Sequence, residues 1–131
     1  MISKIKFIAV SLMLLATSAF SQQQSQIAGT WNGTTISPST GNDLQMEMKI
    51  QENTGTWRFY TVGGSRRINP CLGRDFPITM KNLENSMIAI QVDSDKTIAG
   101  CPAFTVIVQA KENNSLEGKF ADGRPAKFTK Q

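Results

Sequence analysis

The chain of 131 residues contains no histidine. Histidine is the commonest general base and the commonest metal ligand, and it is the usual partner of a nucleophilic serine or cysteine. Its absence removes the Ser-His and Cys-His pairs from consideration. We therefore expect a protein that is not an enzyme, with neither a metal site nor a cofactor.

Carboxylates are the groups that remain for acid–base chemistry, as Asp93 with Asp95 and as Glu112 with Glu117. The segment Asp93-Ser94-Asp95 is typical of a turn, because aspartate side chains bond to their own backbone there. It lacks the further oxygen ligands that a Ca²⁺ site needs. Carboxylates from distant strands can still meet in space, so a carboxylate-based hydrolase is the third and least favoured of three functional hypotheses.

Basic and acidic residues nearly balance in the part of the chain that follows residue 21. The first 21 residues carry two of the 14 basic residues, which leaves 12 basic against 10 acidic residues. So small a balance gives no reason to expect a nucleic-acid partner.

The only long apolar run lies at the N-terminus. Lys4 and Lys6 precede it, and Ala19 and Ser21 follow it at the −3 and −1 positions of a cleavage site before Gln22. This pattern predicts a secretory signal peptide over residues 1–21 and a single domain over residues 22–131. No later segment is long and apolar enough to span a membrane. We expect an exported protein, periplasmic or extracellular.

The two cysteines, Cys71 and Cys101, both follow the leader. An even number of cysteines in an oxidising compartment indicates a disulfide. A redox or nucleophilic thiol would need a C-x-x-C motif or a histidine partner, and the chain has neither. The sequence therefore predicts one structural bridge between Cys71 and Cys101.

From Ile27 onward the apolar residues repeat with a period of two. Residues 44–50 alternate without a fault, and residues 56–62 are aromatic and β-branched. Such patterns are typical of strands that are half buried. Pro77 indicates a strand start or an edge. The remaining predicted strands are residues 76–81, 86–92, 104–110, 116–120 and 125–130.

Short polar turns separate these strands, and Asp122-Gly123 is the strongest hairpin signal among them. About eight strands with no helical stripe indicate an all-β antiparallel meander. Two architectures fit this pattern, a closed barrel or a two-sheet β-sandwich. A barrel removes exposed strand edges and, with eight strands, has room for side chains or one small ligand.

The segment Ile27-Ala28-Gly29-Thr30-Trp31 resembles the opening of calycin barrels, the lipocalins and avidin-like proteins. The resemblance implies an up-and-down barrel in which Gly29 and Trp31 begin the first strand. It also implies that Trp31 closes one end and packs beneath a basic residue near the last strand, Arg124 or Lys127. The chain departs from lipocalins in having no late helix. It departs from avidin-like proteins in having only two tryptophans, so biotin binding is not carried over.

Two groups of residues are candidates for binding. The longest stretch without alternation, residues 62–77, carries Arg66, Arg67 and Arg74 and is tied down at Cys71. Arginine forks suit carboxylates and phosphates, although exposed charges often contribute little.

Alternation along residues 56–62 defines the second group. It places Trp57 and Phe59 in the interior and leaves Arg58 and Tyr60 on the outer surface.

These observations favour a non-enzymatic exported protein that holds a small ligand at the open end of a β-barrel. The alternative is an exported inhibitor or adaptor that meets another protein through the loop bearing Arg66, Arg67 and Arg74. Both hypotheses leave the identity of the ligand or partner open.

Overall fold

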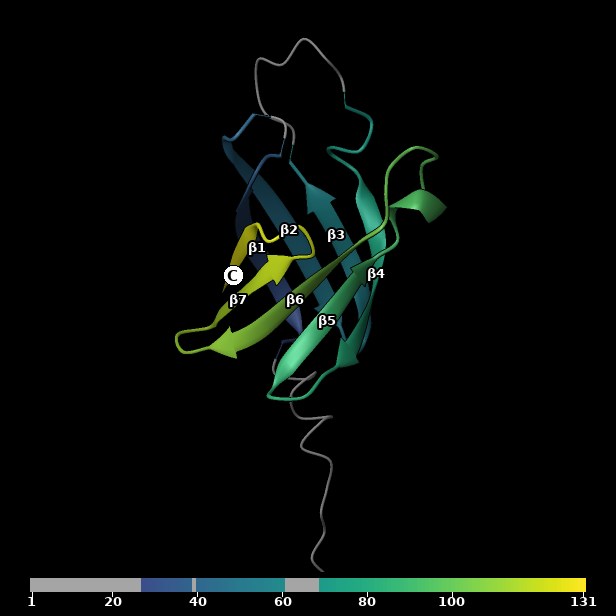
Figure 1. The fold of residues 1–131 in the computed structure, drawn as a ribbon. Helices are drawn as coiled ribbons and strands as arrows, with labels where there is room; N and C mark the ends of the chain where they lie inside the picture. The colour runs from purple at the N-terminus through teal and green to yellow at the C-terminus, as the bar shows by residue number, and fades with distance from the viewer. Residues whose placement is uncertain (1–26, 39, 61–68) are drawn as a thin grey trace, which may run out of the picture.

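Eight antiparallel strands close into a barrel, each paired with its neighbours in sequence and the last paired with the first (Figure 1). The computed structural model describes residues 27–38, 40–60 and 69–131, so the predicted leader lies outside the described residues. The all-β meander is confirmed, and the barrel rather than the sandwich is the architecture. The strands are β1 (Gly29–Ile36), β2 (Asp43–Gln51), β3 (Thr54–Phe59), β4 (Asp75–Asn82), β5 (Met87–Val92), β6 (Phe104–Lys111), β7 (Ser115–Phe120) and β8 (Pro125–Lys130).

The observed strands follow the sequence pattern closely. Every second residue of β2 is buried, as the alternation over residues 44–50 predicts. β3 ends at Phe59, and residues 61 and 62 of that predicted strand lie outside the described part. Ser86 belongs to the turn before β5, where its φ is 60°.

Pro77 lies near the start of β4 in a sheet that has no edge. Its carbonyl oxygen accepts a hydrogen bond from the backbone N–H of Asp93, one residue past the end of β5. The N–H and C=O groups of one residue in a strand point to the same side. The N–H that proline lacks would therefore also point toward Asp93, past the end of β5. The strand-start interpretation is correct, and the edge interpretation is wrong because the barrel closes.

The meander gives the barrel two different ends. The loop end carries the connections β1–β2, β3–β4, β5–β6 and β7–β8, and the turn end carries the three tight turns between the other strands (Figure 1). A one-turn 3-10 helix, η1 (Ser94–Lys96), lies in the β5–β6 connection. The β7–β8 connection is the predicted Asp122-Gly123 hairpin, with Gly123 at a φ of 90°. Among the described residues, no helix has the length and apolar character needed to span a membrane.

Trp31 is buried near the turn end, and its strand begins at Gly29. Its indole Nε1 donates a hydrogen bond to the carbonyl oxygen of Ile27 at 2.8 Å. The basic residue over its ring is Lys130, with Nζ 5.8 Å from the ring centroid, within cation–π range. The expectation of Arg124 or Lys127 is wrong, because Lys130 is the residue paired with Trp31 in the β1–β8 ladder.

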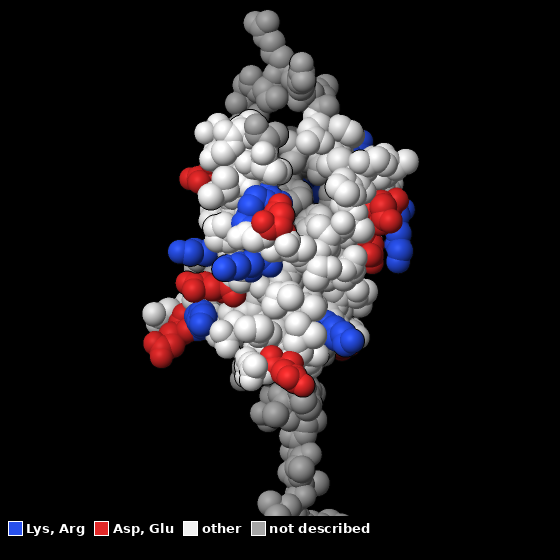
Figure 2. All heavy atoms as spheres, in the orientation of Figure 1, with Lys and Arg blue, Asp and Glu red and all other residues white. Residues whose placement is uncertain are grey.

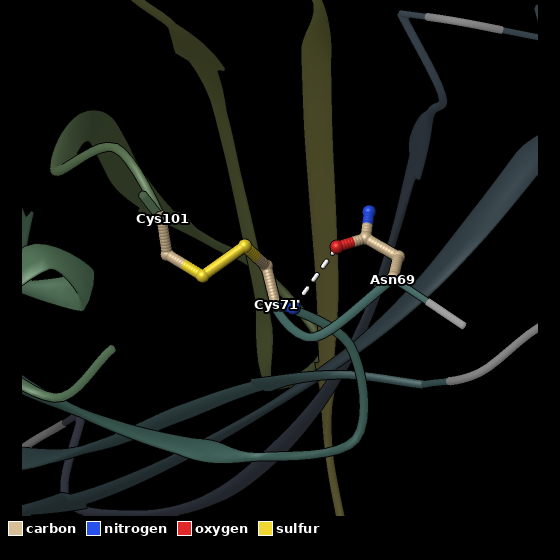
Figure 3. Close-up of a disulfide and its surroundings, with 3 residues drawn as sticks. All are labelled: Asn69, Cys71 and Cys101. Atoms are coloured by element: carbon tan, nitrogen blue, oxygen red, sulfur yellow. Dashed lines mark hydrogen bonds between the residues drawn. A yellow bond between two sulfur atoms is a disulfide. The ribbon is translucent and has the colours of Figure 1, made fainter. Parts of the chain in front are cut away.

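The predicted disulfide between Cys71 and Cys101 is confirmed (Figure 3). It joins the β3–β4 and β5–β6 connections at the loop end, with 5.7 Å between the two Cα atoms. Cys101 is buried against the core, and the backbone N–H of Cys71 donates to Oδ1 of Asn69 at 2.9 Å. The bond therefore fixes two connections that are separated by the β4–β5 hairpin.

Replacing both cysteines, as Cys71→Ala/Cys101→Ala, should lower the free energy of unfolding by about 3–4 kcal/mol, because the unfolded chain regains the entropy of an open loop. Urea denaturation followed by far-UV circular dichroism measures this. The wild-type protein after reduction serves as the control and should unfold at the same urea concentration as the double variant. Equal stability of the oxidised protein and the double variant would contradict the prediction.

Candidate ligand site

An aromatic cluster around Trp57 lies in the interior of the barrel toward its loop end. The indole ring of Trp57 is fully buried. Four phenylalanine rings surround it edge to face, with centroids 5.4–6.1 Å away and interplanar angles of 69–84°. These distances and angles are the ones that aromatic pairs prefer. The four rings belong to Phe59, Phe104, Phe120 and Phe128.

The strand alternation explains why these rings meet. Phe59 ends β3, Phe104 begins β6 and Phe120 ends β7, so each occupies the inward-facing position of its strand nearest the loop end. Phe59 and Phe104 are half buried, whereas Phe120 is 5% exposed. The cluster therefore extends from the fully buried Trp57 to partly exposed rings at the mouth of the barrel.

The buried indole of Trp57 also carries a hydrogen-bond donor. Its Nε1 atom is buried and makes no hydrogen bond to any part of the chain that the structure describes. A buried donor without an acceptor typically costs about 1–3 kcal/mol. The other tryptophan differs in this respect, because Nε1 of Trp31 is bonded to Ile27.

A second buried polar group at the loop end is the hydroxyl of Ser94. Ser94, in η1, is 2% exposed, and its Oγ atom has no hydrogen-bond partner among the described residues. The bond between the N–H of Asp93 and the carbonyl of Pro77 extends the β4–β5 pairing past Val92. Ser94 follows as the next buried position after the inward-facing Val92, at the loop end.

Arg124 braces the rim beside Phe120. Its guanidinium carbon lies 4.6 Å from the centroid of the Phe120 ring. Nη1 donates to the carbonyl of Ile36 at 2.7 Å, and Nε donates to Oδ2 of Asp122 at 2.7 Å. The backbone N–H of Arg124 and, to a smaller extent, its side chain donate hydrogen bonds that hold the pKa of Asp122 below its usual value. Arg124 thus ties the β7–β8 turn to the end of β1 and covers one ring of the cluster.

The opposite side of the rim is braced covalently. Cys71, Ile98 and Phe104 are partly buried against the core, and the disulfide joins Cys71 to the buried Cys101. In the space-filling view, the surface is hollowed in the upper half of the face shown, toward the loop end (Figure 2). Arg124 on one side and the disulfide on the other therefore hold the loop end in place.

The predicted binding residues Arg58 and Tyr60 lie on the outer surface of β2, β3 and β4. Nε of Arg58 donates to Oδ1 of Asp75 at 2.8 Å, which raises the pKa of Arg58. Oη of Tyr60 donates to Oε2 of Glu47 at 2.8 Å, and Lys49 lies 3.6 Å from the other oxygen of Glu47. Both predicted residues are engaged with charged neighbours and take no part in the aromatic cluster.

Of the three arginines predicted to bind through the loop, the structure describes Arg74 alone. Arg74 is exposed, next to β4, whereas Arg66 and Arg67 lie outside the described residues. The described part of the chain holds no group of three or more acidic or cysteine side chains suited to a metal ion. Asp93 and Asp95 lie at the predicted turn, where Oδ2 of Asp93 is 3.6 Å from Nζ of Lys96.

Sequence reasoning took Trp57 and Phe59 as core residues and did not single out Phe104, Phe120 or Ser94. A usable signal was present, because in a meander the inward positions next to alternate connections all meet at one end. Three of those positions are phenylalanine. The lack of a partner for Nε1 of Trp57 and for Ser94 has no signature in the sequence, since it depends on what surrounds each atom in three dimensions.

The hydrogen bond from Tyr60 to Glu47 and, to a smaller extent, burial raise the pKa of the Tyr60 phenol above its ordinary value of 10.0. Tyr60 is the only tyrosine of the chain, so absorbance at 295 nm during an alkaline titration reports on it alone. We expect a midpoint above 10.0, and a lower midpoint for Glu47→Ala, which removes the acceptor and its negative charge. Glu112→Ala, in the turn after β6, is the control and should leave the midpoint unchanged. A wild-type midpoint equal to that of Glu47→Ala would be inconsistent with this bond.

Comparison with known proteins supports the fold. No protein-family model matches the sequence, and no curated protein gives a significant match. A redesigned β-barrel of known structure is similar in fold, with a TM-score of 0.52 and 16% sequence identity, over 87% of this chain and 99% of that one. At this identity the similarity concerns architecture alone: the chain adopts the closed eight-stranded antiparallel barrel.

Proposed function

We propose that this chain is a non-enzymatic, exported, calycin-like binding protein that holds a small ligand in the loop end of its barrel. The observation that carries the proposal is the Trp57 cluster, in which a buried indole with an unpaired donor is continuous with partly exposed phenylalanine rings. Small-molecule sites are typically concave and lined by aromatic side chains with a few polar groups.

The two ends of the barrel differ in a way that supports entry at the loop end. At the turn end, Trp31 is buried and Lys130 lies over its ring. At the loop end, Arg124 and the disulfide hold the walls while Phe59 and Phe104 stay half buried. Walls that are fixed before binding reduce the entropy that a ligand must remove.

The absence of histidine from the sequence supports a protein without catalytic machinery. Of the carboxylates considered for hydrolysis, Glu112 and Glu117 are exposed, and they lie on the β6–β7 turn and on β7. Export is supported by the leader pattern of residues 1–21 and is compatible with the disulfide.

The proposal predicts that the loop end binds an apolar probe. We expect 1-anilinonaphthalene-8-sulfonate to bind the folded protein with one-to-one stoichiometry and enhanced fluorescence. Phe59→Ala should weaken this binding about tenfold, because it removes a ring from the mouth. A fluorescence titration measures the affinity, and circular dichroism shows that the variant is folded.

Ile107→Ala is the matched control, because Ile107 is a large apolar residue exposed on the outer face of β6. It should leave probe binding unchanged. Probe binding that is lost in Ile107→Ala and kept in Phe59→Ala would place the site on the outside of the barrel. Absence of saturable binding to the folded wild-type protein would refute the proposal.

The second candidate function is an inhibitor or adaptor that acts through the loop bearing Arg66, Arg67 and Arg74. The observation that favours it is the disulfide, which ties Cys71, three residues before Arg74, to the rim. A positive result would be a partner protein captured by the immobilised wild-type chain and lost with Arg66→Ala/Arg67→Ala/Arg74→Ala. Capture that survives the triple substitution would remove the loop from consideration.

A further inference from the structure

Among the described residues, Trp57 and Ser94 each bury a polar side-chain atom without a hydrogen-bond partner, and both residues lie toward the loop end. From them we infer that the ligand is a flat, uncharged aromatic molecule whose hydrogen-bond acceptors bond to Nε1 of Trp57 and to the hydroxyl of Ser94. This inference rests on the proposed function and names the class of ligand for the same site.

The acceptor follows from the chemistry of the two groups. An indole N–H only donates, whereas a serine hydroxyl both donates and accepts. Nε1 of Trp57 and Oγ of Ser94 are both buried without a partner in the described chain. Buried polar groups are almost always hydrogen-bonded in folded proteins. Carbonyl and ring oxygens of a bound molecule would accept from these donors and remove the cost of leaving them unpaired.

The absence of charge follows from the side chains that are buried with them. The buried polar or charged residues among those described are Thr35 and Ser94 alone, and the Thr35 hydroxyl already donates to the carbonyl of Pro125 at 2.8 Å. The guanidinium of Arg124, which lies over the Phe120 ring, is bonded to Asp122 and to the Ile36 carbonyl. A charged group entering this interior would lose its hydration without gaining a counter-ion.

The flat shape follows from the rings that line the mouth. The Phe59 and Phe104 rings are tilted by 36°, and the Phe104 and Phe120 rings by 40°, with centroids 5.6 and 5.8 Å apart. Their remaining surface is aromatic, and aromatic partners gain stabilisation there beyond their buried area.

Coumarin and naphthalene are the probes for this class. Both are flat and uncharged with two fused six-membered rings, and only coumarin has an acceptor. In ¹H–¹⁵N spectra, the indole N–H of Trp57 should shift downfield with coumarin and much less with naphthalene. Trp31 is the internal reference, because its indole N–H is already bonded to Ile27, and its signal should stay in place with either probe.

Two variants test the same point through affinity. Trp57→Phe keeps a ring and removes the donor, and Ser94→Ala removes the hydroxyl. Each should weaken coumarin binding about fivefold to tenfold, the effect of one hydrogen bond, and should leave naphthalene binding within about twofold. Ser94→Ala is the milder change, so the test does not depend on the folding of Trp57→Phe.

The outcomes separate this inference from the proposed function. Equal losses for coumarin and naphthalene in the two variants, or an unshifted Trp57 signal with bound coumarin, would overturn the inference. If neither compound binds while 1-anilinonaphthalene-8-sulfonate binds in a Phe59-dependent manner, the ligand class is wrong and the binding function stands. If the sulfonate probe also fails to bind, the proposed function itself fails.

Discussion

The pairing of β1 with β8 is the constraint on which the rest of the structure depends. It joins the first and last strands, and with it every strand has two neighbours. Gly33 permits this seam, because a Cβ there would lie 2.4 Å from the ring of Phe128. Phe128 in turn packs on Trp57 at the centre of the aromatic cluster. The missing side chain at Gly33 thus leaves room for the Phe128 ring, which packs against Trp57.

Much of the fold could be predicted from the sequence, because strand alternation is local information. The faultless pattern from Leu44 to Ile50 became a strand whose inner face is wholly buried. Barrel and sandwich could not be distinguished this way, because both bury one face of every strand. The choice depends on whether the two terminal strands pair. The same limit explains the error over Trp31, whose basic partner Lys130 is set by the β1–β8 register.

The candidate site was only partly predictable. Alternation correctly separated the inward Trp57 and Phe59 from the outward Arg58 and Tyr60. It could not show that Nε1 of Trp57 has no acceptor among the described residues while Nε1 of Trp31 has one, because this depends on the atoms around each indole. The charge of an arginine suggests a binding role when only the sequence is considered. In the structure, Arg124, expected over the ring of Trp31, instead bonds to Ile36 and Asp122 at the loop end.

The disulfide has a topological consequence. It closes a covalent ring from Cys71 to Cys101 that contains the whole of β4 and β5. A protease that cuts the exposed turn between these strands, at Glu84 or Asn85, would leave both pieces on one molecule, each still paired in the barrel. The two pieces would stay covalently joined until the disulfide is reduced. Such a ring makes a single cut between β4 and β5 survivable.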